Sequence, residues 1–245
     1  MRQGPLAGRY PASATMVIAA LIPYLALSAA LQPLTPVIAH SLHMSLQEMS
    51  LSSGMANAAY AVGTVLAVQF ALLLPQRRMM VVYAVILVVA STLTAAAQDP
   101  AMYITGHVLQ GLCTSLLLIA AVPPLVIGYP ASRMRSTAII MNMCIFGAVA
   151  LGPAIGGIQA HSDSWRPLFW VVAVIAVVAL VLSVLTFEDA PPADPTAPRD
   201  PLAIGLAAAG SAAAFYGASE LLTHRFLDVP TFGFLIGGLA LIVLL

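Results

Sequence analysis

Four residues near the middle of the chain place an ionisable group and hydrogen-bonding side chains at helical spacing. His107, Gln110, Gly111 and Thr114 occupy positions i, i+3, i+4 and i+7, so a helix carries them on one face. Imidazole changes its charge close to neutral pH, which suits proton exchange. A lone histidine on a helix can also be a hydrogen-bonded packing residue, and both roles stay open from the spacing alone.

Polar residues at helical spacing also occur in three other apolar runs. They are Tyr24, Ser28 and Gln32 in the first run, Asn57, Tyr60 and Thr64 in the second, and Asn142 in the fifth. Inside a membrane, such residues either line a polar cavity or bond neighbouring helices to each other. A sparsely polar cavity formed by these residues suits small amphiphilic organic molecules.

The elements that must position these residues follow from the composition. The 245 residues are 61% hydrophobic and 7% charged, with a mean hydropathy of +0.99, whereas a soluble domain carries about 25% charged residues. Helices of about 20 apolar residues span a bilayer, and the apolar runs are too long for barrel strands. The sequence therefore predicts an all-α integral membrane protein. Its eight predicted helices are 13–39, 50–74, 79–97, 101–127, 137–160, 167–187, 202–222 and 231–245.

The arginines predict the orientation of these helices. All nine basic residues are arginines, and with eight spans and a cytoplasmic N-terminus most of them fall on the cytoplasmic side, as the positive-inside rule requires. Those on the cytoplasmic side are Arg2, Arg9, Arg77, Arg78, Arg133, Arg135 and Arg199, and those outside are Arg166 and Arg225. We therefore expect a multi-pass protein of the cell (inner) membrane.

One polar segment divides the chain. Residues 188–201 are rich in proline and acidic residues, which favours an extended cytoplasmic linker. The predicted units are a six-helix bundle at 1–187, this linker, and two additional helices at 202–245. The last predicted helix is about 22 Å long at 1.5 Å per residue, so the chain is expected to stop before that helix is complete.

The stretch GAVALGPAIGG in the fifth predicted helix combines poor helix formers with a membrane setting. Gly152 and Gly156 are four residues apart, and small residues at this spacing let two membrane helices pack closely. The longer pattern, formed by Gly147, Gly152, Pro153, Gly156 and Gly157, resembles the helix-five signature of drug/proton antiporters in the major facilitator superfamily.

Three further stretches resemble the same family, in the same order. GHVLQG at 106–111 is similar to the family's helix-four motif, SWRPLFW at 164–170 to the start of its helix six, and PVIAHSL at 36–42 to the end of helix one in the fourteen-helix branch. Six helices, a linker and two more helices are also how that branch begins. We therefore expect this chain to lack the C-terminal bundle of the family.

The resemblance implies a function. It implies a secondary active transporter, not an enzyme, that exports small amphiphilic organic compounds in exchange for protons. Its expected partners are the bilayer, the organic substrate and protons; no nucleic acid, metal or other cofactor is expected. In the family, helix five packs towards the other bundle, so the Gly152 face is expected to lack its partner here.

The sequence departs from the family pattern at three places. Of the acid-and-arginine motif in the loop after helix two, which helps to gate the cytoplasmic face in the family, only Arg77 and Arg78 remain. His107 replaces the buried arginine of helix four, and helix one lacks its usual acid. Glu220 is the only carboxylate well inside a predicted span, so the candidate proton-binding residues are His107 and, second, Glu220.

Two alternatives remain. The chain is a truncated or half transporter that lacks independent activity, self-associates, or needs its missing half. Alternatively, Ser219 in GASEL and the nearby His224 form a serine nucleophile site, although the second glycine of the G-x-S-x-G turn is missing.

Overall fold

The computed structural model describes residues 5–187, 194, 196, 198–221 and 224–245, so the predicted linker lies largely outside the described residues. The described residues form helices joined by short loops, with no strand among them, which confirms the predicted all-α fold. The helices are α1 (Tyr10–Ser41), α2 (Leu46–Leu73), α3 (Gln76–Ala95), α4 (Pro100–Ile127), α5 (Met134–His161), α6 (Arg166–Thr186), α7 (Pro201–Glu220) and α8 (Val229–Val243), with a short 3-10 turn, Ala131–Arg133, before α5. Among them, six are long and apolar enough to cross a membrane; α1 and α8 contain shorter apolar stretches, Tyr10–Pro23 and Val229–Val243.

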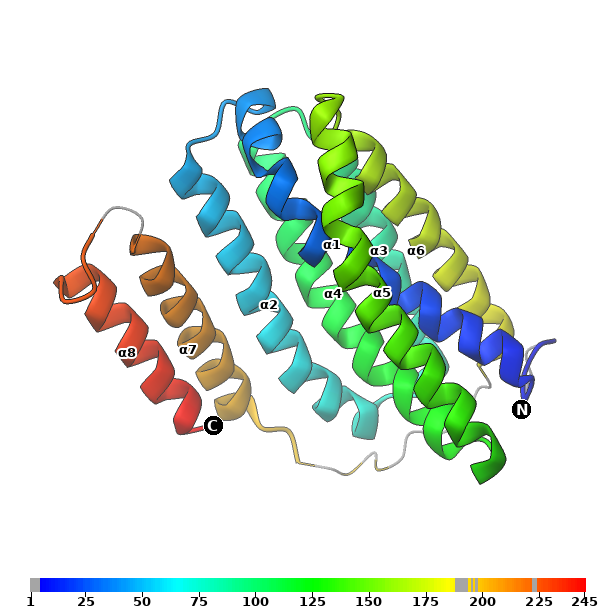
Figure 1. Cartoon of the computed structure of the whole chain (residues 1–245). Coiled ribbons are helices and arrows are strands. Elements are labelled where there is room, and N and C mark those ends of the chain that lie inside the picture. The colour runs from blue at the N-terminus through cyan, green and yellow to red at the C-terminus, as the bar shows by residue number, and fades with distance from the viewer. Residues whose placement is uncertain (1–4, 188–193, 195, 197, 222–223) are drawn as a thin grey trace.

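The helices run up and down side by side (Figure 1). α1 packs along α5, α6 and α4, whereas α3 packs against α4 and α6. α2 packs against α4 on one side and against α7 on the other, and α7 forms a hairpin with α8. The α7–α8 hairpin therefore joins the six-helix bundle through α2.

Local signals fix where the helices begin and end. α2 begins with a capping box in which the Glu48 amide donates to Ser45 Oγ (3.1 Å) and the Ser45 amide donates to Glu48 Oε2 (2.7 Å), satisfying donors that a helix start leaves free. α1 and α5 each end with a left-handed residue, His43 (φ 55°) and Asp163 (φ 51°). At each end the amide of the left-handed residue and the amide of the next residue, Met44 or Ser164, donate to carbonyl oxygens of the last turn, as in the Schellman motif.

The glycines of α5 divide between two faces. A Cβ on Gly152 would overlap the side chain of Ala29, and one on Gly156 would overlap the carbonyl oxygen of Ala30, both on α1. The expectation that the Gly152 face lacks a partner is therefore wrong: α1, in the same bundle, packs against it. Gly147 and Gly157 have nothing within 4 Å of a built Cβ, because they lie on the open side of α5.

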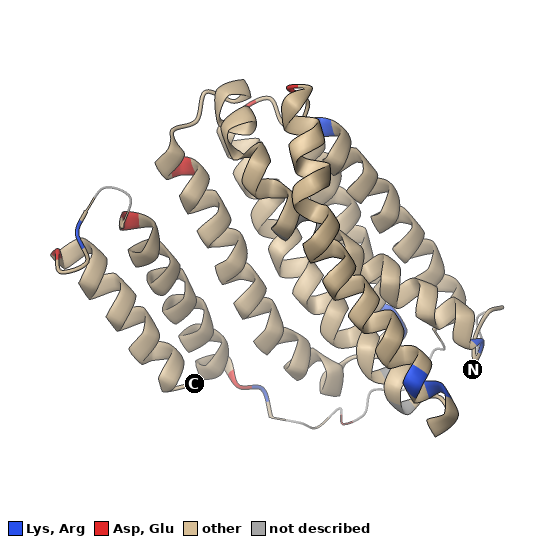
Figure 2. Cartoon of the chain, in the orientation of Figure 1, with Lys and Arg blue, Asp and Glu red and all other residues tan. Residues whose placement is uncertain are grey.

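Charged residues gather at the two ends of the helices (Figure 2). The end at which α1, α3, α5 and α7 begin carries Arg9, Arg77, Arg78, Arg133, Arg135 and Arg199, together with Asp194 and Asp200. The opposite end, which we call the distal end, carries Glu48, Asp99, Asp163, Glu220 and Asp228, with Arg166 and Arg225. Apolar helices with charges at both ends are what a membrane-spanning bundle requires.

Candidate functional site

A cavity of about 490 Å³ lies between α1, α2 and α4. Three of its ten lining residues, Leu31, Ala56 and Gly111, are apolar. The others have hydrogen-bonding side chains: Gln32, Thr35, Ser53, Asn57, His107, Gln110 and Thr114. Asp, Glu, Lys and Arg are not among these lining residues, so this part of the chain offers hydrogen bonds without formal charge. The cavity is thus more polar than the sequence predicts.

We call the α4 side of the cavity, formed by His107, Gln110, Gly111 and Thr114, its floor, and the α1 and α2 sides its walls. His107 is 7% exposed, and its ring stacks on Tyr103 with 5.7 Å between the ring centroids and 19° between the planes. Within the described residues its Nδ1 atom has no hydrogen-bond partner. A buried polar atom without a partner costs free energy, so this nitrogen can bond a molecule that enters the cavity.

Gln110 and Thr114, by contrast, already have protein partners. Nε2 of Gln110 donates to Oγ of Ser91 (3.0 Å), and Oε1 accepts from Oγ1 of Thr94 (3.5 Å). The Thr114 hydroxyl donates to the carbonyl oxygen of Gln110 (2.7 Å). Gln110 therefore bonds α4 to α3, and of the three polar residues on the floor His107 has the uncommitted nitrogen.

The walls carry uncommitted polar groups. Gln32 on α1, and Ser53 and Asn57 on α2, are exposed, and their side chains form no hydrogen bond with other described residues. Lipid cannot hydrogen-bond to an amide, so such groups are expensive on a lipid-facing surface. This face must contact water, a solute or further polypeptide.

The remaining predicted pathway residues lie elsewhere. Asn142 is exposed on α5, and its amide donates to the carbonyl oxygen of Ala138 (2.8 Å). Tyr60 is on α2 but does not line the cavity, and the side chain of Tyr24 lies outside the described residues. The prediction missed Thr35 and Ser53, although their spacing from Gln32 (i+3) and Asn57 (i−4) could have revealed them.

The motif residues hold the helices around the cavity. A Cβ on Gly111 would overlap the Ala56 carbonyl of α2, and one on Gly106 would overlap Thr94 of α3. The two glycines of GHVLQG thus let α4 approach two different helices, and Gly111 brings the cavity floor close to its α2 wall.

The two arginines left from the gating motif lie at the start of α3. Nη2 of Arg77 donates to the Val184 carbonyl near the end of α6 (3.3 Å), where a cation is favoured by the helix dipole. Arg78 is exposed. Arg77 therefore ties α3 to α6 at the end that carries the N-terminus.

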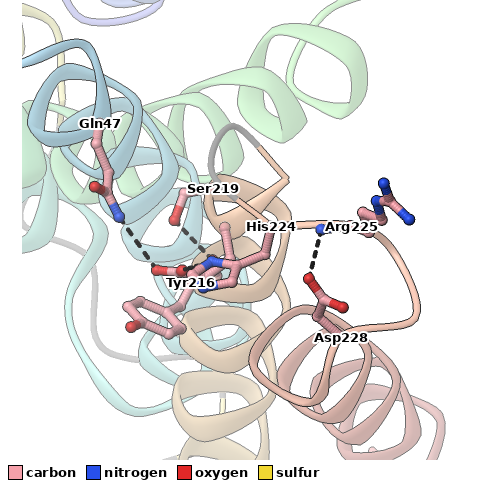
Figure 3. Close-up of polar contacts among 7 residues, drawn as sticks. Gln47, Tyr216, Ser219, His224, Arg225 and Asp228 are labelled. Atoms are coloured by element: carbon pink, nitrogen blue, oxygen red, sulfur yellow. Dashed lines mark hydrogen bonds and ion pairs between the residues drawn. The ribbon is translucent and has the colours of Figure 1, made fainter.

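The residues of the alternative serine site lie at the distal end (Figure 3). The Ser219 hydroxyl donates to the Tyr216 carbonyl of its own helix (2.7 Å), and Nδ1 of His224 lies 3.0 Å from Oε2 of Glu220. The serine is thus bonded to the last turn of α7 while the imidazole pairs with a carboxylate. Among the described residues, no cluster of three or more His, Cys, Asp or Glu could hold a metal ion.

A bundle of apolar helices around an uncharged polar cavity defines a polytopic membrane protein with a solute-sized internal space. The family model of the Major Facilitator Superfamily matches residues 15–245. The chain belongs to this superfamily of membrane transporters.

Relatives and solved structures agree with this assignment. The chain is 29% identical over 86 residues to the "Uncharacterized MFS-type transporter YubD" of Bacillus subtilis (strain 168), covering 35% of this chain and 17% of that protein. It is 27% identical over 143 residues to the "Putative uncharacterized transporter YgaY" of Escherichia coli (strain K12), covering 58% and 36%. It is 31% identical over 84 residues to the "Lincomycin resistance protein LmrB" of Listeria monocytogenes, covering 34% and 18%.

The fold is similar to that of peptide transporters. The crystal structure of the peptide transporter POT in complex with sulfate has a TM-score of 0.65 at 16% identity, covering 98% of this chain and 53% of that one. The POT family transporter PepTSo has a TM-score of 0.61 at 14% identity, covering 95% and 52%. The chain therefore spans about half the length of these transporters, and the curated relatives are matched over less than half of theirs.

Proposed function

We propose that the chain provides the N-terminal half of the substrate pathway in a secondary active transporter that exports small amphiphilic organic compounds in exchange for protons. In this proposal the cavity between α1, α2 and α4 contacts the substrate, and the N-terminus lies in the cytoplasm of a cell whose inner membrane holds the protein. The arginine-rich end then faces the cytoplasm, in keeping with the positive-inside rule.

The observation that carries the proposal is the set of uncommitted polar groups around one cavity. The Gln32 and Asn57 amides can each donate and accept, whereas the lining is free of the formal charges that would select a strongly ionic solute. Leu31 and Ala56 add apolar surface. Such a lining suits a molecule with one apolar part and a few hydrogen-bonding groups.

His107 is the proposed proton-binding residue of the cavity. Among the described lining residues it is the one titratable side chain, and a buried ionisable group in a membrane helix commonly serves transport. The distant relative named for lincomycin resistance supports drug export as the substrate class.

An efflux assay tests this proposal. An efflux-deficient host producing the 245-residue chain is loaded with fluorescent dyes, one cationic and one neutral, and release is followed with and without an energy source. We expect energy-dependent efflux that His107→Ala reduces at least tenfold and whose pH dependence it flattens. His161→Ala, which removes an exposed histidine at the end of α5, is the matched control and leaves efflux unchanged.

The alternative is a truncated or half transporter without independent activity. Membranes that hold the folded chain but release dye no faster than the empty-vector control favour this alternative. A His107→Ala variant that keeps both efflux and its pH profile removes the histidine from the proposal.

A further inference from the structure

A buried carboxylate lies at the distal end of α7, away from the cavity. Glu220 is the last residue of α7, and its side chain is 5% exposed. A carboxylate is disfavoured at a helix C-terminus by the helix dipole, and a buried charge needs partners. Its ionised form therefore depends on the groups that surround it.

Two donors from different segments approach this carboxylate (Figure 3). Nδ1 of His224, in the loop after α7, lies 3.0 Å from Oε2. Nε2 of Gln47, in the first turn of α2, donates a long hydrogen bond of 3.5 Å to Oε1. The carboxylate thus joins the α7–α8 hairpin to α2 through the Gln47 hydrogen bond.

The imidazole connects the buried carboxylate to water. The side chain of His224 is 44% exposed, whereas that of Glu220 is almost completely covered. A half-exposed imidazole in contact with a buried carboxylate has the arrangement of a proton relay, because its two ring nitrogens can exchange protons with different partners.

The other charged groups around Glu220 are already paired with their own neighbours. On α2, the Glu48 carboxylate accepts from Ser45 in the capping box. At the start of α8, Asp228 Oδ2 accepts from the backbone amide of Arg225 (2.8 Å). On α7 itself, the Tyr216 hydroxyl also hydrogen-bonds the Glu220 carboxylate, and the Tyr216 ring packs edge-on against Phe234 of α8, with centroids 5.0 Å apart. Glu220 thus contacts two titratable side chains, His224 and Tyr216, and of these the imidazole can exchange protons through two ring nitrogens.

We propose that Glu220 and His224 form a proton-binding site, filled from the water at the distal end, whose protonation releases the α7–α8 hairpin from Gln47 of α2. A neutral imidazole with its proton on Nδ1 takes a proton from water at Nε2. The imidazolium then gives the Nδ1 proton to Oε2 of Glu220, so an N–H bond breaks and an O–H bond forms. The ring is left neutral, the site has gained one proton, and the neutral carboxylic acid is a weaker acceptor for the Gln47 amide.

Infrared spectroscopy of the purified chain in lipid nanodiscs tests the site without requiring transport. After a jump to acidic pH, we expect a carboxylic-acid C=O band that Glu220→Gln abolishes. Glu48→Gln, the same change at an exposed position of α2 where glutamine still completes the capping box, retains the band. His224→Ala slows the appearance of the band at least several-fold, because the buried carboxylate loses its relay to water.

The second readout is the contact between α2 and α7. We expect a disulfide between cysteines introduced at Gly54 of α2 and Phe215 of α7, where the two Cβ atoms would lie 3.5 Å apart and Gln47 is kept, to form more slowly at acidic than at neutral pH in a background free of other cysteines. Glu220→Gln is expected to remove this difference. An acid band that survives in Glu220→Gln, or a cross-linking rate independent of pH in the parent chain, overturns the proposal.

If Glu220→Gln does not fold, His224→Gln carries the test, and an unchanged rate of protonation in that variant rejects the relay. Both readouts are independent of dye efflux, so the proposed function can fail while this site stands.

Discussion

At the residue scale, the polar side chains of the cavity fall into two groups. One group forms hydrogen bonds between helices, and the other forms no hydrogen bond with a described residue and can bond a solute. Gln110 bonds Ser91 and Thr94, whereas the exposed amide of Gln32 has no hydrogen bond to another described residue. Both were predicted from the sequence as pathway residues. Spacing alone could not separate them, because a polar stripe shows which face a residue occupies and not whether its partner comes from the protein.

This difference predicts opposite effects for two glutamine variants. Gln110→Ala removes the hydrogen bonds between α3 and α4, so it should lower the free energy of unfolding by about 1–2 kcal/mol. Gln32→Ala should leave stability within about 0.5 kcal/mol and reduce transport. Denaturant unfolding in detergent, followed by circular dichroism, measures the first effect, and the dye assay measures the second. Equal losses of stability in the two variants would contradict this division of roles.

At the element scale, the glycines of α5 show what the sequence could and could not determine. The small-xxx-small spacing of Gly152 and Gly156 correctly predicts a close helix contact. The choice of partner came from the family resemblance and was wrong, since α1 fills the groove. The sequence indicates that a helix face is smooth, but which helix lies on it is decided by the packing of the whole bundle.

Matched glycine variants test this packing. Gly152→Leu forces α5 away from Ala29. It should lower the free energy of unfolding by about 1–3 kcal/mol through overpacking and so lower the yield of monodisperse protein in detergent. Gly147→Leu adds the same side chain on the open side of the helix, where nothing lies within 4 Å of a Cβ, and should keep the parent yield. Size-exclusion chromatography after membrane extraction distinguishes the two. Equal yields would mean that α1 does not pack closely at Gly152.

At the scale of the whole molecule, the eight helices lie within a few residues of their predicted ranges, because apolar runs between charged breaks define membrane helices well. The position of the α7–α8 hairpin against α2 was not predictable in this way. It depends on small residues such as Gly54, whose Cβ would contact Phe215 of α7, and on Ser211, whose hydroxyl lies 3.4 Å from the Ala58 carbonyl. Contacts of this kind leave no periodic signal in the sequence.

The segregation of arginines predicts the orientation of the molecule in the membrane. Ser132→Cys, at the arginine-rich end, should be protected from a membrane-impermeant maleimide in intact cells, whereas Ser162→Cys, at the distal end, should react. Cys113 and Cys144 are first replaced by alanine to remove background labelling. In lysed cells both positions should be labelled. Labelling of Ser132→Cys in intact cells would contradict the predicted orientation, with the arginine-rich end in the cytoplasm.

The two-sided packing of α2 has a consequence for observing the protein at work. Ser53 and Asn57 face the cavity, while their chain neighbours Gly54 and Ala58 contact α7. Any tilt of α2 that changes the width of the cavity also displaces these contacts with the α7–α8 hairpin. We expect a fluorophore on α8, remote from any bound solute, to report such a tilt.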